Sequence, residues 1–259
     1  MRMKIAIVTG ASSGLGKAFA QKLDKLGLDE IWGVALNADG LNETAKLLKT
    51  AMRPFAVDLT KDGLGVIKTA LETNLPDVRW LVNAAGFGKF GRYDEIPLEQ
   101  SANMIRLNCE ALVCLTEQCL PYMKAGAKIA QFSSVAAFQP TPYVNVYSAT
   151  KAFVYNYARG LGAELKPRQI SVCAVCPFWT KTHFFDRAER DDKNVVINYI
   201  VMYNPEQVVN KAYDDIMRGK DVSIYGFIAR SQARLARIVP TKLVMKIWIK
   251  QQKFDKRYK

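Results

Sequence analysis

Short runs of apolar residues alternate along the chain with longer stretches whose apolar residues recur at helical spacing. Several short runs are too continuously apolar to leave a face in water, which is typical of strands buried on both sides. We predict strands at residues 4–8, 30–36, 53–57, 79–82, 128–132, 170–176 and 221–225. Helices are predicted between them, near residues 14–27, 40–50, 61–75, 98–124, 147–166 and 205–218. The alternation indicates an α/β fold, a doubly wound parallel sheet of about seven strands with helices on both faces.

Domain organisation follows from the absence of a break in this pattern. No segment rich in Pro, Gly or Ser divides residues 1–228. Asn204, Pro205 and Glu206 predict one helix start well, as an N-cap, a proline at the first helical position and an acid in the first turn. We therefore predict one domain over residues 1–228 and a C-terminal extension over residues 229–259.

Composition excludes several classes of protein. The chain has 259 residues, 49% of them hydrophobic and 10% aromatic, which excludes disorder as its general state. The longest apolar runs, 31–36 and 172–179, are far shorter than the roughly 18 residues of a membrane span. After Lys4 the apolar run ends at Thr9, too early for the apolar core of a secretory signal. We expect a cytoplasmic protein.

Cysteine and histidine offer little support for metal chemistry. The cysteines number five, an odd count in a chain too long to need disulfides, so reduced thiols are expected. Cys173 and Cys176 fall in a predicted strand, where positions three apart point to opposite faces. His183 is the only histidine, which leaves both a zinc site and a Ser/His/Asp triad without support. We predict no metal site.

Positive charge is concentrated in the C-terminal extension. Residues 229–259 hold ten Lys or Arg and one acid, Asp255, so they carry +9 of the formal net charge of +13. The remaining +4 gives no indication of a nucleic-acid partner.

Apolar residues in the extension recur at helical spacing on both sides of Pro240, which predicts two basic amphipathic helices. Two interpretations stay open. The apolar side could contact the inner face of a membrane, or it could cover a substrate crevice or a neighbouring subunit, which we favour.

A glycine-rich turn follows the first predicted strand and precedes a helix. Its spacing is Gly10-x-x-x-Gly14-x-Gly16. Glycines there let the backbone turn tightly and aim helix-start amides at a pyrophosphate, although an ordinary turn would also fit. We predict a dinucleotide site formed by Gly10, Ser12, Ser13, Gly14, Leu15 and Gly16. Small residues at the end of the fourth strand, 83–86, leave space for a ligand at the same edge of the sheet.

Four further polar residues are candidates for chemistry. Asn108 lies on the inward stripe of a predicted helix, where its amide is either a satisfied core group or a functional one. Ser134 follows the fifth strand, and Tyr147 and Lys151 share one helix face at i, i+4. A nearby cation is expected to lower the pKa of a tyrosine toward working pH, as a general acid or base requires. Such a pair is more often a solvated face beside a core aromatic.

Taken in order and spacing, these motifs resemble the short-chain dehydrogenase/reductase family over about residues 4–225. The matching features are the glycine turn after Thr9, Asn83-Ala84-Ala85-Gly86, Asn108, Ser134 thirteen residues before Tyr147, and Tyr147-x-x-x-Lys151. The resemblance implies a Rossmann-type oxidoreductase that transfers a hydride between NAD or NADP and a ketone or secondary alcohol. It also implies a homodimer or homotetramer formed through the helices at 98–124 and 147–166.

The resemblance assigns a role to each matching residue. Tyr147 would move the hydroxyl proton, Ser134 would bind the substrate oxygen, and Lys151 would hold the nicotinamide ribose. Asn108 would hold a relay water near Lys151. The implied cofactor contacts beyond the glycine turn are Asn37, Asp58, Leu59, Asn83, Ala84, Ala85, Gly86, Tyr147, Lys151, Pro177 and Thr182. Among them Asp58 would contact the adenine amino group, Asn83 and Gly86 the adenosine ribose, and Thr182 the nicotinamide amide.

The sequence departs from the family pattern at two places. Phe178 and Trp179 follow Pro177, where the family usually has a glycine. After the second strand the chain has Leu36 and Asn37, neither the Asp that binds the NAD ribose nor the Arg that binds the NADP phosphate. Without an acid to repel the 2′-phosphate, we favour NADP over NAD.

Aromatic residues predict the character of the substrate. They gather in loops that leave the carboxyl ends of strands, and the substrate contacts predicted among them are Phe138, Tyr143, Phe178, Trp179 and Phe184. These side chains favour an apolar ketone or alcohol of steroid, lipid or aromatic type, although ordinary loop packing would also explain them. The alternative function is a catalytically silent NAD(P)-binding sensor or membrane-associated adaptor, but a sensor needs no acid/base tyrosine.

Overall fold

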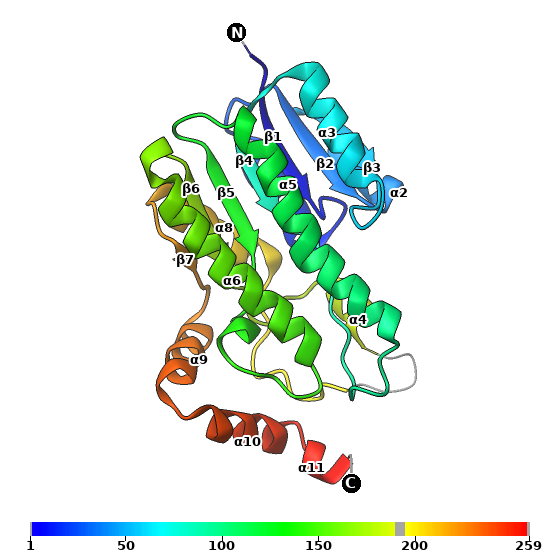
Figure 1. Cartoon of the computed structure of the whole chain (residues 1–259), viewed down its shortest axis with the longest axis vertical. Helices are drawn as coiled ribbons and strands as arrows, with labels where there is room; N and C mark the ends of the chain where they lie inside the picture. Colours follow the sequence, from blue (N-terminus) through cyan, green and yellow to red (C-terminus); the bar gives the residue numbers. More distant parts are fainter. Residues whose placement is uncertain (1, 190–194, 258–259) are drawn as a thin grey trace.

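A parallel sheet organises the molecule (Figure 1). The computed structural model describes residues 2–189 and 195–257. Its strands are β1 (Lys4–Thr9), β2 (Glu30–Ala35), β3 (Ala51–Ala56), β4 (Asp77–Asn83), β5 (Lys128–Phe132), β6 (Ser171–Val175) and β7 (Val222–Ser223). They form a seven-stranded sheet in the order β3-β2-β1-β4-β5-β6-β7, every neighbouring pair parallel. The predicted fold class is confirmed, and the chain order reverses beside β1, where open parallel sheets bind ligands.

Helices cover both faces of the sheet. On one face lie α3 (Gly63–Asn74), α5 (Leu112–Cys119) and α6 (Asn145–Leu165). On the other lie α1 (Gly14–Leu23), α2 (Ala38–Ala45) and α8 (Pro205–Met217). The remaining helices are α4 (Leu98–Ile105), the short α7 (Phe184–Ala188), α9 (Phe227–Ile238), α10 (Thr241–Gln251) and α11 (Phe254–Arg257).

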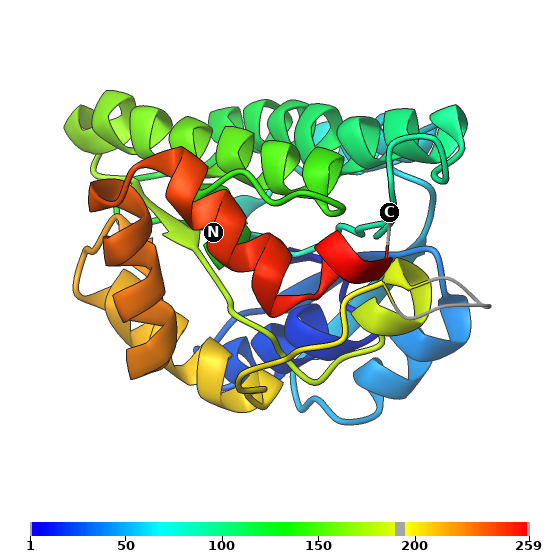
Figure 2. The same ribbon diagram turned by 90° about the horizontal axis from the view of Figure 1, so that it is seen from below.

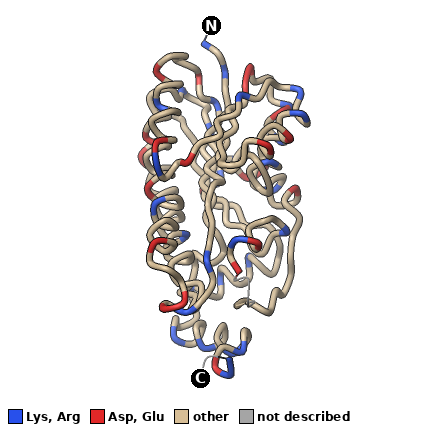
Figure 3. The backbone as a smooth tube through the Cα atoms, turned by 90° about the vertical axis from the view of Figure 1, so that its right-hand side faces the viewer, with Lys and Arg blue, Asp and Glu red and all other residues tan. Residues whose placement is uncertain are grey.

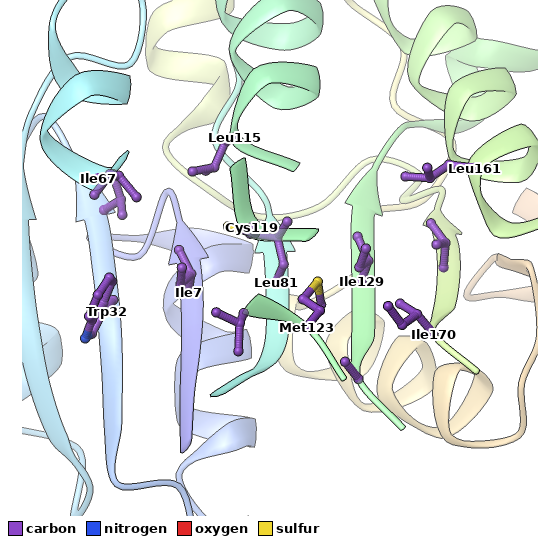
Figure 4. Close-up of a cluster of buried hydrophobic side chains, with 14 of the residues drawn as sticks. Ile7, Trp32, Ile67, Leu81, Leu115, Cys119, Met123, Ile129, Leu161 and Ile170 are labelled. Atoms are coloured by element: carbon purple, nitrogen blue, oxygen red, sulfur yellow. The ribbon is translucent and has the colours of Figure 1, made fainter. Parts of the chain in front are cut away.

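Alternation along each strand divides the core into two layers. Ile5 and Ile7 of β1 pack under α3, α5 and α6, whereas Ala6 and Val8 pack toward α1 and α8. Figure 4 shows the first layer, with Ile7, Leu81 and Ile129 from three strands beneath helix residues. Because both faces are buried, β1, β2, β4, β5 and β6 are largely apolar, as the sequence pattern predicts, whereas the edge strand β3 buries only Phe55.

Two predicted elements differ from the structure. The predicted helix 98–124 contains a π-helical turn, η1 (Arg106–Ala111), between α4 and α5 and ends in a 3-10 turn, η2 (Leu120–Tyr122). Pro121 explains the 3-10 ending, because its ring cannot continue the helix. The predicted strand 221–225 is shortened to the two residues of β7, with Gly226 at φ 93° before α9. The start of α8 is confirmed, since Asn204 and Gln207 form a capping box.

The C-terminal extension forms helices at the carboxyl ends of the strands, opposite the N-terminus (Figure 1). Pro240 separates α9 from α10, as predicted. Seen from that end, α10 and α11 cross the molecule (Figure 2). Gln252 holds the end of α10 in place by accepting hydrogen bonds from Ile197 N and Asn198 N, both 3.0 Å long. Within the residues described, no helix combines the length and apolar character needed to cross a membrane.

Candidate active site

Three of the predicted catalytic side chains meet at the carboxyl end of β5. Ser134 caps the 3-10 turn η3 (Val135–Phe138) that follows β5, and its Oγ accepts a hydrogen bond from Ala136 N. Tyr147 and Lys151 lie one turn apart at the start of α6, with Lys151 Nζ 5.6 Å from the centre of the Tyr147 ring. Ser134 is close enough to the phenol of Tyr147 to act on its pKa. The structure therefore brings together a hydroxyl, a phenol and an amine.

Burial controls the protonation of this cluster. It raises the pKa of Tyr147 to about 12, which outweighs the lowering effect of Ser134. Burial also lowers the pKa of Lys151 to about 8, and Lys151 Nζ donates to the carbonyl of Phe132 at 2.9 Å. A net lowering of the tyrosine pKa is not found in this arrangement, because desolvation is the largest effect on it. Near neutral pH Tyr147 is a protonated phenol, ready to donate.

Asn108 has all the partners that a buried amide needs. Its Nδ2 donates to Phe87 O at 2.9 Å and to Thr150 Oγ1 at 3.0 Å, and its Oδ1 accepts from Phe87 N at 3.1 Å. Asn108 lies within η1, and its hydrogen bonds join η1 to the loop after β4 and to α6. Close packing at Gly86 fixes the region further, since a Cβ there would lie 2.9 Å from Asn108 Oδ1 and 3.3 Å from Lys151 Nζ.

The glycine turn is built from positions where a side chain cannot fit. Gly10 and Gly14 have φ of 69° and 52°, the left-handed region that favours glycine. A Cβ on Gly16 would lie 2.3 Å from Gly10 O. Ser13 caps α1 without a side-chain hydrogen bond, so the first amides of the helix remain available to a phosphate. This backbone fits the pyrophosphate of a dinucleotide.

Residues after β4 lie against this turn, but Asn83 points elsewhere. Thr9 Oγ1 accepts a hydrogen bond from Ala85 N at 2.9 Å, which joins the ends of β1 and β4. Asn83 Nδ2 donates to Thr116 Oγ1 and Gln131 Oε1 inside the core, at 2.9 and 3.0 Å. Because the Asn83 side chain is bonded inside the core, only its backbone is left to contact an adenosine ribose.

Asp58 is an ionised carboxylate at the end of β3. Although burial raises its pKa, two hydrogen bonds from Thr60 and the charges of Lys61 and Arg187 lower the pKa overall. Asp58 is followed by the buried Leu59. A fixed carboxylate there suits the amino group of an adenine.

At the end of β2, Asn37 serves as the N-cap of α2. Its Oδ1 accepts a hydrogen bond from Gly40 N at 2.9 Å. Ser12 lies close by, since a Cβ on Gly40 would be 2.9 Å from Ser12 Cβ. Two neutral polar side chains, Ser12 and Asn37, therefore lie near each other at the end of β2.

The loop after β6 reaches across to the glycine turn. A Cβ on Gly14 would lie 3.0 Å from Thr182 Cγ2, so Thr182 closes over the turn. Pro177 O accepts a hydrogen bond from Val135 N at 3.0 Å, which holds the loop to η3. The loop thus connects the glycine turn to the Ser134 region.

A cavity joins these parts. Ser134, Tyr147 and Lys151 line it together with Leu15, Ala84, Gly86, Pro177 and Thr182. Phe178, Trp179 and Phe184 also line it, as predicted for substrate contacts. Lys151 is the one charged side chain among the described residues that line the cavity, so its wall is largely apolar.

Two predicted substrate residues lie outside the cavity lining. Phe138 packs edge-on against Tyr155, with ring centres 4.9 Å apart, and beneath Arg237. Tyr143 packs against Phe254 of α11, with ring centres 4.0 Å apart. Both rings are half-buried in these contacts, so a contact of either ring with the substrate stays a prediction.

Several residues that line the cavity are not among those predicted from the sequence. They are Phe132, Ser133, Val135, Ala136, Gln139, Thr141, Val144, Thr180, Phe185, Gln232 and Trp248. Trp248 of α10 donates from Nε1 to Pro142 O at 2.9 Å, and Gln232 comes from α9. Trp248 belongs to the apolar pattern of the extension, as do Leu243 and Ile247, which the structure leaves exposed; Gln232 has no distinguishing signal in the sequence. The C-terminal extension covers the cavity.

Fold and site define a Rossmann-type oxidoreductase: a glycine turn at the switch point of a parallel sheet, and a tyrosine, lysine and serine beside it. Residues 4–193 match the sequence model of the family described as short chain dehydrogenase, so the chain belongs to the short-chain dehydrogenase/reductase family. It is an NAD(P)-dependent dehydrogenase or reductase, as the membership and the solved relatives establish.

Several proteins are similar to this one. An uncharacterized oxidoreductase of Staphylococcus epidermidis is 31% identical over 180 residues, which cover 68% of this chain and 78% of that protein. A very-long-chain 3-oxoacyl-CoA reductase of Danio rerio is 33% identical, with 69% of this chain and 59% of that protein covered. The solved short-chain dehydrogenase of Sphingobium yanoikuyae in complex with NADPH has a TM-score of 0.78 and 28% identity, covering 90% of this chain and 92% of that one.

Proposed function

We propose that the protein interconverts an apolar ketone and the corresponding secondary alcohol, with Tyr147, Ser134 and Lys151 as its catalytic residues. The observation that carries this proposal is the meeting of the three side chains at one end of a largely apolar cavity. The nicotinamide cofactor supplies or accepts the hydride.

Tyr147 supplies the proton in the reduction. Its raised pKa keeps the phenol protonated near neutral pH, so it donates to the carbonyl oxygen as that oxygen gains negative charge. Ser134 donates a hydrogen bond to the same oxygen, which stabilises the developing charge. Lys151 binds the nicotinamide ribose and Asn108 keeps the loop at Gly86 in place.

For the cofactor we favour NADP. Ser12 and Asn37 are neutral and can hydrogen-bond a phosphate, and the end of β2 places no carboxylate at Leu36 or Asn37 to repel it. The glycine turn, Asp58, the backbone at 83–86, Pro177 and Thr182 would hold the rest of the dinucleotide.

The cavity supports a substrate with an apolar body. Phe178, Trp179 and Phe184 form an aromatic wall, and the side chains of Gln139 and Gln232 add polar amide groups to the lining. A neutral ketone of lipid, steroid or aromatic type fits this wall, because the described lining offers no charge for an ionic group beyond Lys151. The Danio rerio relative named above is a reductase of long acyl thioesters by its name.

We also propose a cytoplasmic homo-oligomer. Exposed apolar residues on α4 and α6 support a subunit interface: Leu98 is 85% exposed, Ile105 51% and Phe153 46%.

The experiment is a panel of aliphatic, aromatic, steroid and acyl-thioester ketones assayed with NADPH and NADH. We expect turnover of at least one bulky apolar ketone. In Tyr147→Phe, turnover should fall by about 10² to 10⁴, because the proton donor is lost. Binding of NADPH, followed by its fluorescence, should change only a few-fold, because the phenylalanine ring preserves the packing.

Thr141→Val serves as the matched control, since it also removes a hydroxyl that lines the cavity. If Tyr147→Phe keeps more than a tenth of the wild-type rate, Tyr147 is not the proton donor.

A further inference from the structure

The C-terminal extension has an inward face that is already occupied. In α9, Ala229 and Ala233 are buried and Gln232 lines the cavity. In α10, Trp248 is buried and lines the same cavity. The substrate cavity therefore explains one side of each helix, and it leaves the opposite sides without a role.

The outward side of α9 is apolar. Phe227 is 76% exposed, Leu235 58% and Ile238 80%. At 3.6 residues per turn these three side chains fall on one side of the helix, away from Ala229 and Ala233. Large apolar side chains gathered on an exposed helix face mark a contact surface rather than ordinary packing.

The outward side of α10 combines apolar and cationic side chains. Leu243 is 49% exposed and Ile247 56% exposed. Lys242, Lys246 and Lys250 are exposed as well and, being four residues apart, form a row beside them. Ile238 and Leu243 lie on either side of the Pro240 turn, so the two outward sides follow each other along the chain.

The charge of the C-terminal helices indicates which kind of partner surface they can bind. Residues 222–254 contain seven Lys or Arg and no Asp or Glu. Figure 3 shows Lys and Arg gathered at this lower end of the molecule. A second copy in a symmetric contact would bring these cations against one another, which is unfavourable. An anionic lipid surface offers both negative headgroups for the lysines and an apolar region for leucine and isoleucine.

We propose that the outward face of α9 and α10, formed by Phe227, Leu235, Ile238, Lys242, Leu243, Lys246, Ile247 and Lys250, binds the surface of a bilayer containing anionic phospholipid. The apolar side chains enter the boundary between headgroups and acyl chains, and the lysines contact phosphate groups. Because the inward faces of the same helices line the cavity, binding places the cavity beside the lipid. The value of having the cavity beside the lipid rests on the proposed apolar substrate. The lipid contact itself does not depend on the substrate.

The test is flotation of the full chain with vesicles of phosphatidylcholine alone and with about a third phosphatidylglycerol. We expect binding to the anionic vesicles that weakens as salt is raised, because salt screens the attraction. The triple variant K242Q/K246Q/K250Q should bind roughly a hundredfold more weakly. K25Q/K46Q/K68Q, which removes three exposed lysines outside the extension, should bind as the wild type does.

A second pair of variants examines the apolar contribution. I238S/I247S should lose most vesicle binding, whereas L47S/V66S, two exposed positions away from the extension, should keep it. Turnover of a small water-soluble ketone is expected to be equal in all four variants, so failure of the catalytic proposal would be seen separately. Two results overturn the lipid proposal: no binding of the wild type to anionic vesicles at low salt, or a smaller particle size for I238S/I247S with unchanged vesicle binding, which would indicate a second copy.

Discussion

Burial acts on Tyr147 and Lys151 in opposite senses, since it favours the neutral form of each group. The phenol keeps its proton to higher pH and the amine loses its proton at lower pH, so their pKa values move apart, from 10.0 and 10.5 to about 12 and about 8. A proton donor and an amine with a depressed pKa then share one helix face. The hydrogen bond from Lys151 to Phe132 O keeps the amine in place while its charge changes.

This depressed lysine pKa predicts a pH dependence of stability. Between pH 8 and the ordinary lysine value of 10.5, the unfolded chain binds more protons than the folded one, so folding becomes more favourable as pH rises. Lys151→Met removes the group. From pH 7.5 to 9.5, the free energy of unfolding of the wild type should rise relative to the variant by about 2 kcal/mol.

Urea unfolding at several pH values measures that difference. The pH range of the measurement ends below 10 because Tyr147 has the opposite effect above that pH. The unfolded chain loses the tyrosine proton at lower pH than the folded chain, so the free energy of unfolding falls as pH rises. A difference between wild type and variant that stays constant with pH would show that Lys151 keeps its ordinary pKa.

We expect a single side chain at the end of β2, Asn37, to determine the preference between NADP and NAD. Asn37→Asp keeps the cap of α2, because aspartate is as good an N-cap as asparagine. The new carboxylate should repel a 2′-phosphate and bind a ribose hydroxyl. We expect the ratio of kcat/KM for NADH to that for NADPH to rise about tenfold or more.

Asn42→Asp adds the same charge on the exposed side of α2 and is the control. If both variants leave the ratio unchanged, Asn37 does not face the ribose, and Leu36 is the next residue to change.

At the scale of elements, the sequence predicts what local pattern determines and misses what tertiary contact determines. Apolar runs place the strands because burial on both faces removes alternation. The sequence pattern does not predict the π-helical turn η1. This turn contains Asn108, which hydrogen-bonds to the backbone of Phe87, a residue distant in sequence. The spacing of Ser134, Tyr147 and Lys151 predicts their meeting, whereas the direction of the Phe138 and Tyr143 rings depends on helices more than ninety residues later.

Helix α10 should control access to the cavity through Trp248. Trp248→Ala removes a buried ring and its hydrogen bond to Pro142 O, which should lower the free energy of unfolding by about 3 kcal/mol. KM for a bulky apolar ketone should rise about tenfold while kcat changes little, because no catalytic group is touched.

Steady-state kinetics and urea unfolding measure the two effects. Ile247→Ala, the neighbouring residue on the exposed side, should leave both within error. Equal KM values for wild type and Trp248→Ala would mean that the substrate does not reach α10.

On the scale of the whole molecule, the two exposed apolar surfaces have different surroundings and should have different partners. The exposed apolar side chains of α9 and α10 lie among cations, and residues 222–254 contain no Asp or Glu. The surface on α4 and α6 includes Ile105 and Phe153 and has acids nearby, such as Glu99, which pairs with Arg106 at 2.9 Å. Mixed charge around an apolar centre suits a symmetric contact between copies, because each side offers both signs.

We therefore expect light scattering to give a particle of two or four times 29 kDa at micromolar concentration. Ile105→Asp/Phe153→Asp should reduce it to one chain, because two carboxylates from each copy would be buried in the contact. Leu47→Asp/Val66→Asp adds the same charge at exposed apolar positions on α3 and just beyond α2, and should leave the particle size unchanged. If the wild type is a 29 kDa particle, the α4 and α6 surface is not a subunit interface, and its exposed side chains need another partner.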